Sequence, residues 1–215
     1  MIDYSLYVIT TDLSSSMENH LEIARDALCG GATVIQFREK EAGTRELLYL
    51  ARQIKKVAEA AKVPLIVNDR VDVGLAVDAE GVHIGQGDIP IEVARRLLGK
   101  DRIIGVTATS LEEAVEAERR GADYLGVSPV FATPSKDDAG EPMGLKKLGE
   151  IRRAVRIPIV AIGGITRENL EGVINAGADG IAVISAIAAA SDRKQATADL
   201  LGRIEKCKKK RKNMR

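Results

Sequence analysis

The sequence predicts a single-domain α/β fold in which eight parallel strands close into a (β/α)8 barrel. Eight short hydrophobic runs alternate with amphipathic helical stretches along the chain. Polar clusters directly follow several of these runs, as expected where the strand ends of a barrel open onto one face. The length of 215 residues suits one large domain of this kind without a second hydrophobic core.

The expected strands are runs of four or five mostly aliphatic residues, too short for buried helices. In chain order they are Leu6–Thr10, Val34–Arg38, Leu65–Asn68, Gly81–Ile84, Ile103–Thr107, Tyr124–Ser128, Ile159–Ile162 and Gly180–Ile184. The intervening helices are clearest at Glu46–Ala61 and Leu111–Arg120, where apolar residues recur at helical spacing. Three helix-to-strand junctions carry Gly31, Gly121 and Gly177, which we expect to end helices in the left-handed conformation and to be structural.

Composition excludes several classes of function. Only 3% of the residues are aromatic and none is Trp, which disfavours recognition of nucleic acids by base stacking. No apolar run approaches the roughly 18 residues of a membrane span, and the N-terminus does not resemble a secretion signal, so no membrane partner is expected. Cys29 and Cys207 are isolated, and we expect Cys29 to lie in the core. These features predict a cytoplasmic protein.

The net charge of +1 hides an asymmetry between the two ends of the chain. Residues 206–215 hold seven Lys or Arg and no acid, which leaves 25 basic against 31 acidic residues elsewhere. Because like charges repel and nothing apolar or aromatic dominates this stretch, we expect a barrel over residues 1–205 followed by a disordered basic tail over 206–215. Contact of the tail with RNA or an anionic surface is the alternative.

The cluster Gln36-Phe37-Arg38-Glu39-Lys40 ends the second run. Residues at every second position of a strand share a face, so Gln36, Arg38 and Lys40 are expected to point together, and Phe37 the other way. Two cations aimed into a barrel require carboxylates or a bound anion nearby. The alternative is a structural ion pair with Glu39 or Glu41.

Two carboxylates are expected at neighbouring strand ends. Asn68-Asp69 closes the third run, and Asp88 lies in the Gly85-Gln86-Gly87-Asp88 turn after the fourth. An all-oxygen set without clustered Cys or His suits Mg²⁺ better than Zn²⁺, and Mg²⁺ commonly takes one or two carboxylates with phosphate and water completing its shell. Asp88 has a second interpretation as the cap of the fourth helix, because Pro90 follows it closely.

The second half of the barrel predicts a site for a monophosphate. The long loop 131–142 supplies Thr133, Ser135 and Lys136, while Gly163-Gly164 and Ile184-Ser185 follow the seventh and eighth strands. Backbone N–H groups can approach phosphate oxygens closely at glycines, and barrels of this kind bind phosphate at this place. A plain solvated loop and a merely tight Gly-Gly turn are the alternatives.

Two anion sites therefore emerge on one face, a charged one that suits a diphosphate and a neutral one that suits a monophosphate. The two histidines do not suggest a nucleophile system. His83 lies within a strand, where a core or rim role is commoner than catalysis, and His20 is expected on the surface of the first helix.

With these clusters in register, the chain resembles the thiamine phosphate synthase family over nearly its whole length. The resemblance implies a TIM barrel that joins 4-amino-2-methyl-5-hydroxymethylpyrimidine diphosphate to a (carboxy)thiazole phosphate and releases diphosphate, with Mg²⁺ on Asp69 and Asp88. It implies that the pyrimidine diphosphate is bound by Gln36, Phe37, Arg38, Glu39, Lys40, Asn68, Thr107 and Lys136. It places the thiazole phosphate on Thr133, Pro134, Ser135, Gly164, Ile184 and Ser185.

The family pattern also implies roles for individual residues, and this sequence differs from the pattern at a few positions. Arg38, Lys40 and Lys136 are expected to stabilise the leaving diphosphate, so the enzyme class is a transferase. Thr107 stands where the family usually has Ser, and Ala132 and Pro134-Ser135 depart from its usual loop residues. The partners are then small-molecule substrates, with a homo-oligomer possible.

Two other functions compete with this one. A thiazole tautomerase-like isomerase would share the barrel and the monophosphate site, but it needs a proton-transferring side chain such as a His after the fifth strand, where this chain has Thr107-Ala108-Thr109. A non-catalytic barrel that binds a phosphate ligand would not need the diphosphate cluster. Turnover with both substrates distinguishes these functions.

Overall fold

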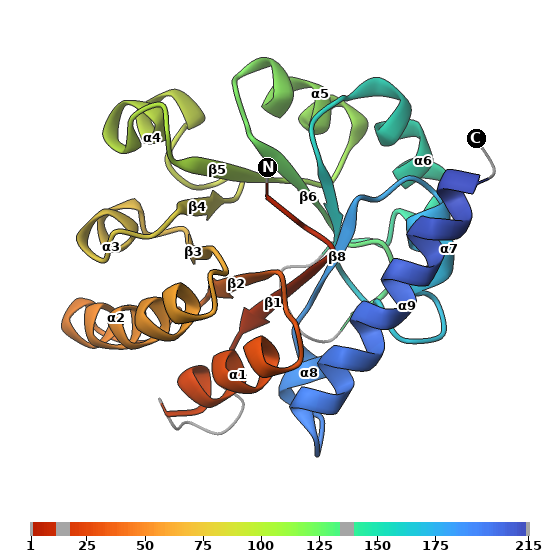
Figure 1. Cartoon of the computed structure of the whole chain (residues 1–215). Helices are drawn as coiled ribbons and strands as arrows, with labels where there is room; N and C mark the ends of the chain where they lie inside the picture. The colour runs from red at the N-terminus through yellow and green to blue at the C-terminus, as the bar shows by residue number, and fades with distance from the viewer. Residues whose placement is uncertain (1, 12–17, 134–139, 214–215) are drawn as a thin grey trace.

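Eight parallel strands form a closed barrel in the computed structural model, which describes residues 2–11, 18–133 and 140–213 (Figure 1). Each strand pairs with its sequence neighbours, and β8 returns to β1 with Val183 opposite Val8. The strands are β1 (Leu6–Thr10), β2 (Val34–Phe37), β3 (Leu65–Asn68), β4 (Gly81–Ile84), β5 (Ile103–Ala108), β6 (Tyr124–Val127), β7 (Ile159–Ala161) and β8 (Gly180–Val183). The predicted fold class is confirmed, and no strand end differs from its expected position by more than one residue.

Helices surround the barrel and connect successive strands. They are α1 (Glu18–Cys29), α2 (Thr44–Ala60), α3 (Val71–Ala76), α4 (Ile91–Leu98), α5 (Leu111–Arg119), α6 (Gly144–Ala154), α7 (Leu170–Asn175), α8 (Ser185–Ala188) and α9 (Arg193–Asn213). The buried positions of α2 recur at helical spacing, and Ser110 caps α5 by accepting a hydrogen bond from the backbone N–H of Glu113. The remaining surface of each helix faces solvent.

Alternation along each strand divides the hydrophobic core into two layers. One layer lies between strands and helices and is made mostly of aliphatic side chains, such as Ile35 of β2, together with the ring of Phe37. The other fills the barrel interior and contains Tyr7 and Tyr124. Gln36 points into this inner layer, as its strand position predicts. The inner layer thus forms the floor beneath the strand ends.

The three junction glycines are structural, as predicted. Gly31, Gly121 and Gly177 have φ angles of 94°, 90° and 116°, in the left-handed region that side chains with a Cβ rarely adopt. A Cβ on Gly177 would also lie 2.4 Å from Cγ of Arg152. These glycines end helices at the face opposite the strand ends.

The expected disordered tail is wrong for the residues that the structure describes, because α9 continues to Asn213. Cys207 is buried, and the guanidinium of Arg211 donates to the carbonyl oxygens of Ile174 and Ala178 at 2.7 and 3.0 Å. Lys208 Nζ donates to Ser5 Oγ at 2.6 Å. Hydrogen-bond acceptors on other parts of the chain therefore hold Lys208 and Arg211 in place, although repulsion among the basic side chains suggested disorder.

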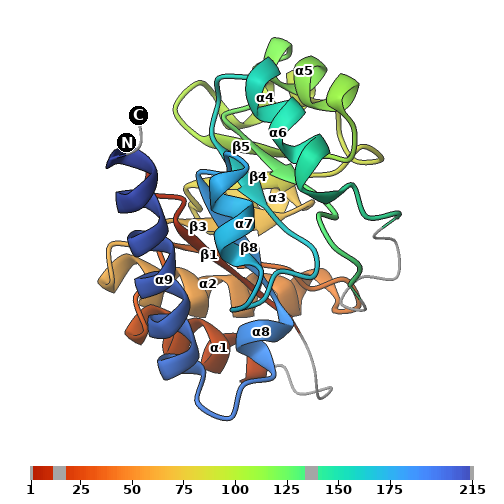
Figure 2. The same cartoon turned by 90° about the vertical axis from the view of Figure 1, so that its right-hand side faces the viewer.

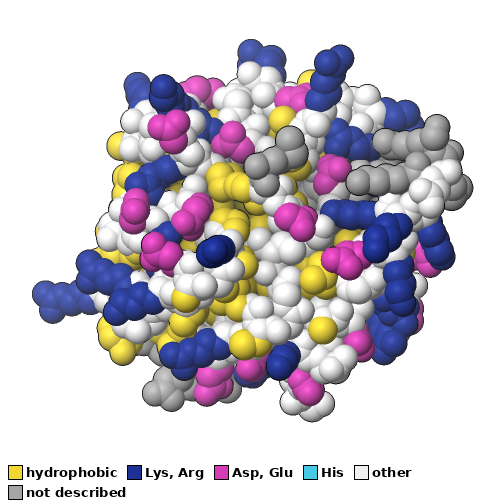
Figure 3. Space-filling view, viewed as in Figure 1, with side chains coloured by type: hydrophobic (Ala, Val, Ile, Leu, Met, Phe, Trp, Pro, Cys, Tyr) yellow, Lys and Arg dark blue, Asp and Glu magenta, His cyan; other side chains and the backbone are white. Residues whose placement is uncertain are grey.

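Helix α9 runs along the side of the barrel next to α7 and α1 (Figures 1 and 2). The Lys and Arg side chains on this side stand among acidic ones and do not form a single basic patch (Figure 3). Lys210, for example, lies 3.4 Å from a carboxylate oxygen of Glu171. Cys29, expected in the core, is exposed at the end of α1. Within the described ranges, no helix is long and apolar enough to cross a membrane.

Candidate active site

A polar cavity of about 420 Å³ opens at the carboxyl ends of the strands from β2 to β6. Its walls carry both cations and both carboxylates of the predicted diphosphate site. The lining residues are Arg38, Lys40, Asn68, Asp69, His83, Gly85, Gln86, Gly87, Asp88, Thr107, Thr109 and Ser128. The structure thus brings together residues that are up to 90 positions apart in the sequence.

Asp69 and Asp88 lie in direct contact across this cavity. Asp69 has a left-handed backbone, with φ of 59°, a conformation that Asp tolerates better than most residues. Burial, and then the hydrogen bond and charge of Asp88, raise the pKa of Asp69 to about 6, while Lys40 and Arg38 oppose the shift. Two carboxylates held this close favour a cation or a proton between them.

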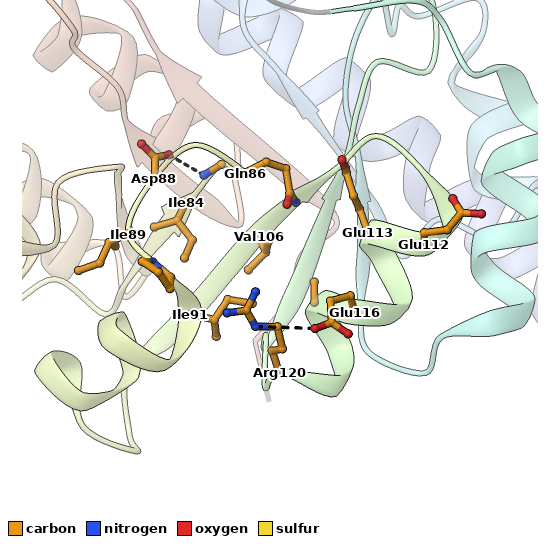
Figure 4. A pocket seen from close by; sticks show the side chains of 13 residues that line it. Ile84, Gln86, Asp88, Ile89, Ile91, Val106, Glu112, Glu113, Glu116 and Arg120 are labelled. Atoms are coloured by element: carbon orange, nitrogen blue, oxygen red, sulfur yellow. Dashed lines mark hydrogen bonds and ion pairs between the residues drawn. The ribbon is translucent and has the colours of Figure 1, made fainter.

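Asp88 does not cap α4, as the second interpretation required. Its carboxylate accepts a hydrogen bond from the backbone N–H of Gly85 at 2.7 Å, and the residue before α4 is Pro90, without a side-chain cap. The bond closes the turn Gly85–Asp88 and aims the carboxylate at the strand ends (Figure 4). Asp88 is therefore positioned for the cavity by its own turn.

Behind this turn lies a separate cavity of about 350 Å³ between α4 and α5 (Figure 4). Its acidic side chains have structural partners. Glu113 accepts hydrogen bonds from the backbone N–H and the hydroxyl of Thr109, and Glu116 binds Arg119 and lies 3.9 Å from Arg120. This cavity shares Asp88 with the polar one but carries none of the predicted cations.

Two residues of the Gln36–Lys40 cluster point away from the cavity. Phe37 packs in the outer core, with its ring centroid 5.3 Å from that of His20. Glu39 accepts hydrogen bonds from the backbone N–H groups of Glu41 and Ala42, and its other oxygen lies 3.0 Å from Nε2 of His20. The structure therefore does not bring these two side chains, expected on the pyrimidine diphosphate, into the polar cavity.

His20 corrects a second expectation, because it is fully buried and not on the surface. Its Nδ1 lies 2.9 Å from the hydroxyl of Thr10, so both ring nitrogens have partners. Burial would raise the pKa of Glu39, but the hydrogen bonds from Glu41, His20 and Ala42 outweigh it and lower that pKa. Glu39 thus anchors the loop that carries Arg38 and Lys40.

A second cavity, of about 340 Å³, opens beside the first at the ends of β6, β7 and β8. It contains the described residues of the predicted thiazole phosphate site, and none of the described residues that line it is Lys or Arg. The lining residues are Ser128, Ala132, Thr133, Ile162, Gly163, Gly164, Ile165, Thr166, Ala182, Val183, Ile184, Ser185 and Ala186. Pro134, Ser135 and Lys136, expected on the neighbouring loop, lie outside the described residues.

The Gly163-Gly164 turn needs glycine for two reasons. The φ angles are 100° and 60°, and a Cβ on Gly164 would lie 2.3 Å from the carbonyl oxygen of Ala132. The side chain of Asn169 holds the turn, because its amide donates to the carbonyl oxygen of Gly164 and accepts from the N–H of Thr166, both at 2.8 Å. Both observations concern the shape of the turn, so they fit the tight-turn interpretation as well as a phosphate site.

The two cavities meet at Ser128, which lines both. Beneath them a small cavity of about 20 Å³ reaches into the barrel, where it is lined by Gln36, His83 and Thr107 together with Tyr7 and Tyr124. Sequence reasoning missed Ser128 and both tyrosines. The one sequence signal for these residues was a polar side-chain atom at a strand position that alternation predicts to face the barrel interior.

Comparisons with known proteins agree with this arrangement. Residues 6–187 match the family described as thiamine monophosphate synthase. The chain is 54% identical to the thiamine-phosphate synthase of Chloroflexus aurantiacus over 89% of its own length and 88% of that protein. The same identity is found with the thiamine-phosphate synthase of Moorella thermoacetica, over 89% of this chain and 91% of the relative.

A solved structure shares both fold and sequence. Thiamine phosphate pyrophosphorylase from Pyrococcus furiosus superimposes with a TM-score of 0.88 at 45% identity, covering 95% of this chain and 97% of its own. The chain therefore belongs to the thiamine monophosphate synthase family of transferases.

Proposed function

We propose that this enzyme joins 4-amino-2-methyl-5-hydroxymethylpyrimidine diphosphate to a (carboxy)thiazole phosphate, giving thiamine phosphate and diphosphate, with CO2 released as well when the thiazole carries a carboxylate. The observation that carries the proposal is the pair of cavities that meet at Ser128, one charged and one neutral. The similar proteins from Chloroflexus and Moorella are thiamine-phosphate synthases, which supports the same product. A reaction between two phosphorylated substrates needs two such sites side by side.

The charged cavity suits the pyrimidine diphosphate. Arg38 and Lys40 place two positive charges at its rim, and Asn68 and Thr107 add neutral hydrogen-bonding groups on its wall. Gln36 and Thr107 line the floor, where the pyrimidine ring would lie. Lys136, on the neighbouring loop, would add a third cation. In this proposal Phe37 and Glu39 support the site without contacting the substrate.

Asp69 and Asp88 fit a magnesium ion. Both are hard oxygen donors, they lie in contact, and burial together with the hydrogen bond and charge of Asp88 raises the pKa of Asp69. The described residues contain no cluster of three or more His, Cys, Asp and Glu side chains, so a zinc-type site is not favoured there. Bound at this pair, Mg²⁺ would neutralise part of the diphosphate charge.

The protein side chains then act on the departing group. The C–O bond between the pyrimidine methylene and diphosphate breaks, and the electron pair leaves with the diphosphate oxygen. Arg38, Lys40 and Lys136 stabilise this growing negative charge more strongly than they stabilise the bound substrate, which lowers the barrier. The electron-rich aminopyrimidine supports the positive charge left on the methylene carbon.

The neutral cavity positions the second substrate. Its phosphate would be bound by the backbone N–H groups of Gly164 and Ser185 and by the hydroxyls of Thr133 and Ser185, all on the lining of one cavity. The thiazole nitrogen then attacks the methylene carbon across the Ser128 boundary, forming the new C–N bond. Fixed positions for both substrates supply much of the remaining acceleration.

Mixing the two substrates with the purified protein tests the proposal. We expect release of diphosphate and formation of thiamine phosphate in equal amounts, dependent on Mg²⁺ and on both substrates. Conversion of the thiazole phosphate alone into an isomer would indicate the tautomerase-like function instead. Binding without turnover would indicate a ligand-binding barrel, and either result would contradict the proposal.

A further inference from the structure

A chain of four hydrogen bonds crosses the inside of the barrel beneath the two cavities. Gln36 Nε2 donates to the hydroxyl oxygen of Tyr7 at 2.8 Å, and that oxygen lies 2.8 Å from the hydroxyl of Tyr124. The Tyr124 hydroxyl lies 2.9 Å from Nδ1 of His83, and Nε2 of His83 lies 2.9 Å from Oγ1 of Thr107. The chain connects Gln36 on β2 with Thr107 on β5 through side chains from β1, β6 and β4.

Two glycines make room for this chain. A Cβ at Gly105 would lie 2.1 Å from Cζ of Tyr124, and a Cβ at Gly126 would lie 2.7 Å from Cε1 of His83. Both tyrosines are almost completely buried, at 1% exposure. Burial raises the pKa of both hydroxyls, so they remain protonated hydrogen-bond donors. The missing side chains at Gly105 and Gly126 therefore leave the space that Tyr124 and His83 occupy in the barrel interior.

The hydrogens of the chain run in one direction. An amide nitrogen only donates, so the Tyr7 oxygen accepts from Gln36 and its own hydrogen points to Tyr124. Tyr124 then donates to Nδ1 of His83, which leaves the ring proton on Nε2 and makes Thr107 Oγ1 an acceptor. The hydroxyl hydrogen of Thr107 remains for an acceptor in the cavity, and Gln36 presents its carbonyl oxygen.

We propose that Tyr7 and Tyr124 are positioning residues that fix the Nε2–H tautomer of His83 and make Thr107 a donor while Gln36 is an acceptor. The proposal rests on the proposed function, because its consequence is recognition of the pyrimidine ring. An aminopyrimidine offers N–H donors on its amino group and acceptors on its ring nitrogens, so an acceptor and a donor at the cavity floor complement it. If the hydrogen bonds ran in the opposite direction, Thr107 would become an acceptor and Gln36 a donor.

Nitrogen NMR of the histidine rings tests the direction of the chain without turnover. The protein has two histidines, and a His20→Gln variant assigns their signals. With the rings neutral at alkaline pH, we expect the single ring proton of His83 on Nε2 in the unmodified protein and a mixture of the Nδ1–H and Nε2–H tautomers in Tyr124→Phe. A proton on Nδ1 in the unmodified protein, or a tautomer that Tyr124→Phe leaves unchanged, would overturn the proposal.

Kinetics test the consequence for the substrate. We expect Tyr7→Phe and Tyr124→Phe each to lower kcat/KM for the pyrimidine diphosphate about tenfold, with the KM for the thiazole phosphate unchanged. The double variant should lose no more kcat/KM than the single variant with the larger loss, because either change breaks the same chain.

Tyr4→Phe is the matched control, since the Tyr4 ring lies 4.8 Å from that of Tyr124 but its hydroxyl is outside the chain. An equal loss in Tyr4→Phe, or losses that multiply in the double variant, would overturn the positioning role. If Tyr124→Phe does not fold, Tyr7→Phe decides. If the unmodified protein itself shows no turnover, the proposed function fails, while the NMR result still decides the chain.

Discussion

At the scale of single residues, Asp69 shows how backbone and side chain serve one purpose. The left-handed backbone of Asp69 carries the carboxylate against Asp88, beside Arg38 and Lys40. This arrangement is unfavourable for two negative charges in the metal-free protein. Its cost is acceptable only if a cation or a proton relieves it, which is the behaviour expected of a binding site and not of a structural ion pair.

Asp69→Asn should therefore stabilise the metal-free protein and impair the enzyme. A raised folded-state pKa means that the ionised carboxylate costs stability: the cost is absent below the unfolded pKa, grows as the pH rises and is complete above about 6. We expect a gain of about 1 kcal/mol at pH 7.5 after allowance for solvent screening, and a smaller gain at pH 5. Thermal unfolding without metal measures it. Activity should fall at least tenfold with a higher Mg²⁺ requirement.

Asp72→Asn is the control, because Arg70 lowers the pKa of Asp72 and so reverses the sign of the effect. Loss of the Asp72 charge should destabilise the protein at neutral pH and leave the Mg²⁺ requirement unchanged. Full activity of Asp69→Asn at low Mg²⁺ would contradict the proposed metal site.

Glu39 offers a second residue-scale prediction. Glu39→Gln should lower kcat/KM for the pyrimidine diphosphate about tenfold, because the loop carrying Arg38 and Lys40 loses its charged anchor. The KM for the thiazole phosphate should not change. The lowered pKa of Glu39 means that its stabilising effect is present above the unfolded pKa and is lost as the pH falls. Kinetics with each substrate varied in turn measure the split, and Glu41→Gln, on the same loop, is the control.

Sequence alone located the site residues but not the direction of every side chain. Alternation placed Gln36 on the inner face correctly, because strand geometry is local, and Arg38 and Lys40 line the cavity from the loop after β2. It could not show that Glu39 meets His20, since that contact joins β2 and α1 through tertiary packing. The burial of His20 has the same cause: its partners Thr10 and Glu39 become visible only in the folded chain.

At the scale of elements, the Gly163-Gly164 turn and helix α9 show opposite outcomes of prediction. A Gly-Gly pair after a strand has few uses, so the sequence singled out this turn. The basic run from Lys206 suggested disorder, because repulsion between its charges can be read from the run itself. The groups that bind these charges lie elsewhere in the chain. Arg211 donates to the carbonyl oxygens of Ile174 in α7 and Ala178 in the loop before β8, and no pattern within the run reveals them.

Gly164→Ala should damage the neutral cavity specifically. The added Cβ meets the Ala132 carbonyl oxygen at 2.3 Å, so the turn or the loop must move, and we expect at least a tenfold higher KM for the thiazole phosphate. Gly121→Ala is the matched control, because its φ of 90° is similarly left-handed but a Cβ there meets nothing within 4 Å. It should cost about 1 kcal/mol of stability and leave KM unchanged. Equal kinetics in the two variants would contradict the assignment of this turn to phosphate.

Truncation after Glu205 should destabilise the protein instead of leaving it unchanged. It removes buried Cys207, the two hydrogen bonds of Arg211 and the contact of Lys208 with Ser5. We expect a loss of roughly 2–4 kcal/mol in the free energy of unfolding, measured in urea. Lys209→Gln, a change at an exposed position of the same helix, is the control and should have little effect. An unchanged midpoint in the truncated protein would show that the last turns of α9 are dispensable.

At the scale of the whole molecule, the barrel places a charged and a neutral cavity on one face with Ser128 between them. The sequence predicted this pairing because strand order in a closed parallel barrel follows chain order. What it could not supply was the floor beneath them, where side chains from five strands meet.

The two cavities should also separate kinetically. Arg38→Ala should mainly lower kcat, by roughly 2–4 kcal/mol of barrier, because its interaction strengthens as diphosphate departs. Ser185→Ala should mainly raise the KM for the thiazole phosphate, by about 1 kcal/mol, because that phosphate has the same charge before and during the reaction. Steady-state kinetics decide between them. The reverse pattern would show that the substrates occupy the opposite cavities.

Closure of the ring has a consequence for how the chain may be connected. β1 pairs with β2 on one side and with β8 on the other, so geometry does not mark it as the first strand. The hydrogen bond from Lys208 to Ser5 brings the last helix beside the start of β1. A short linker between them, with a new opening at the exposed turn around Gly121, would give a circular permutant that keeps every strand pair and both cavities. The fold should therefore depend on the strand pairs and not on where the chain starts.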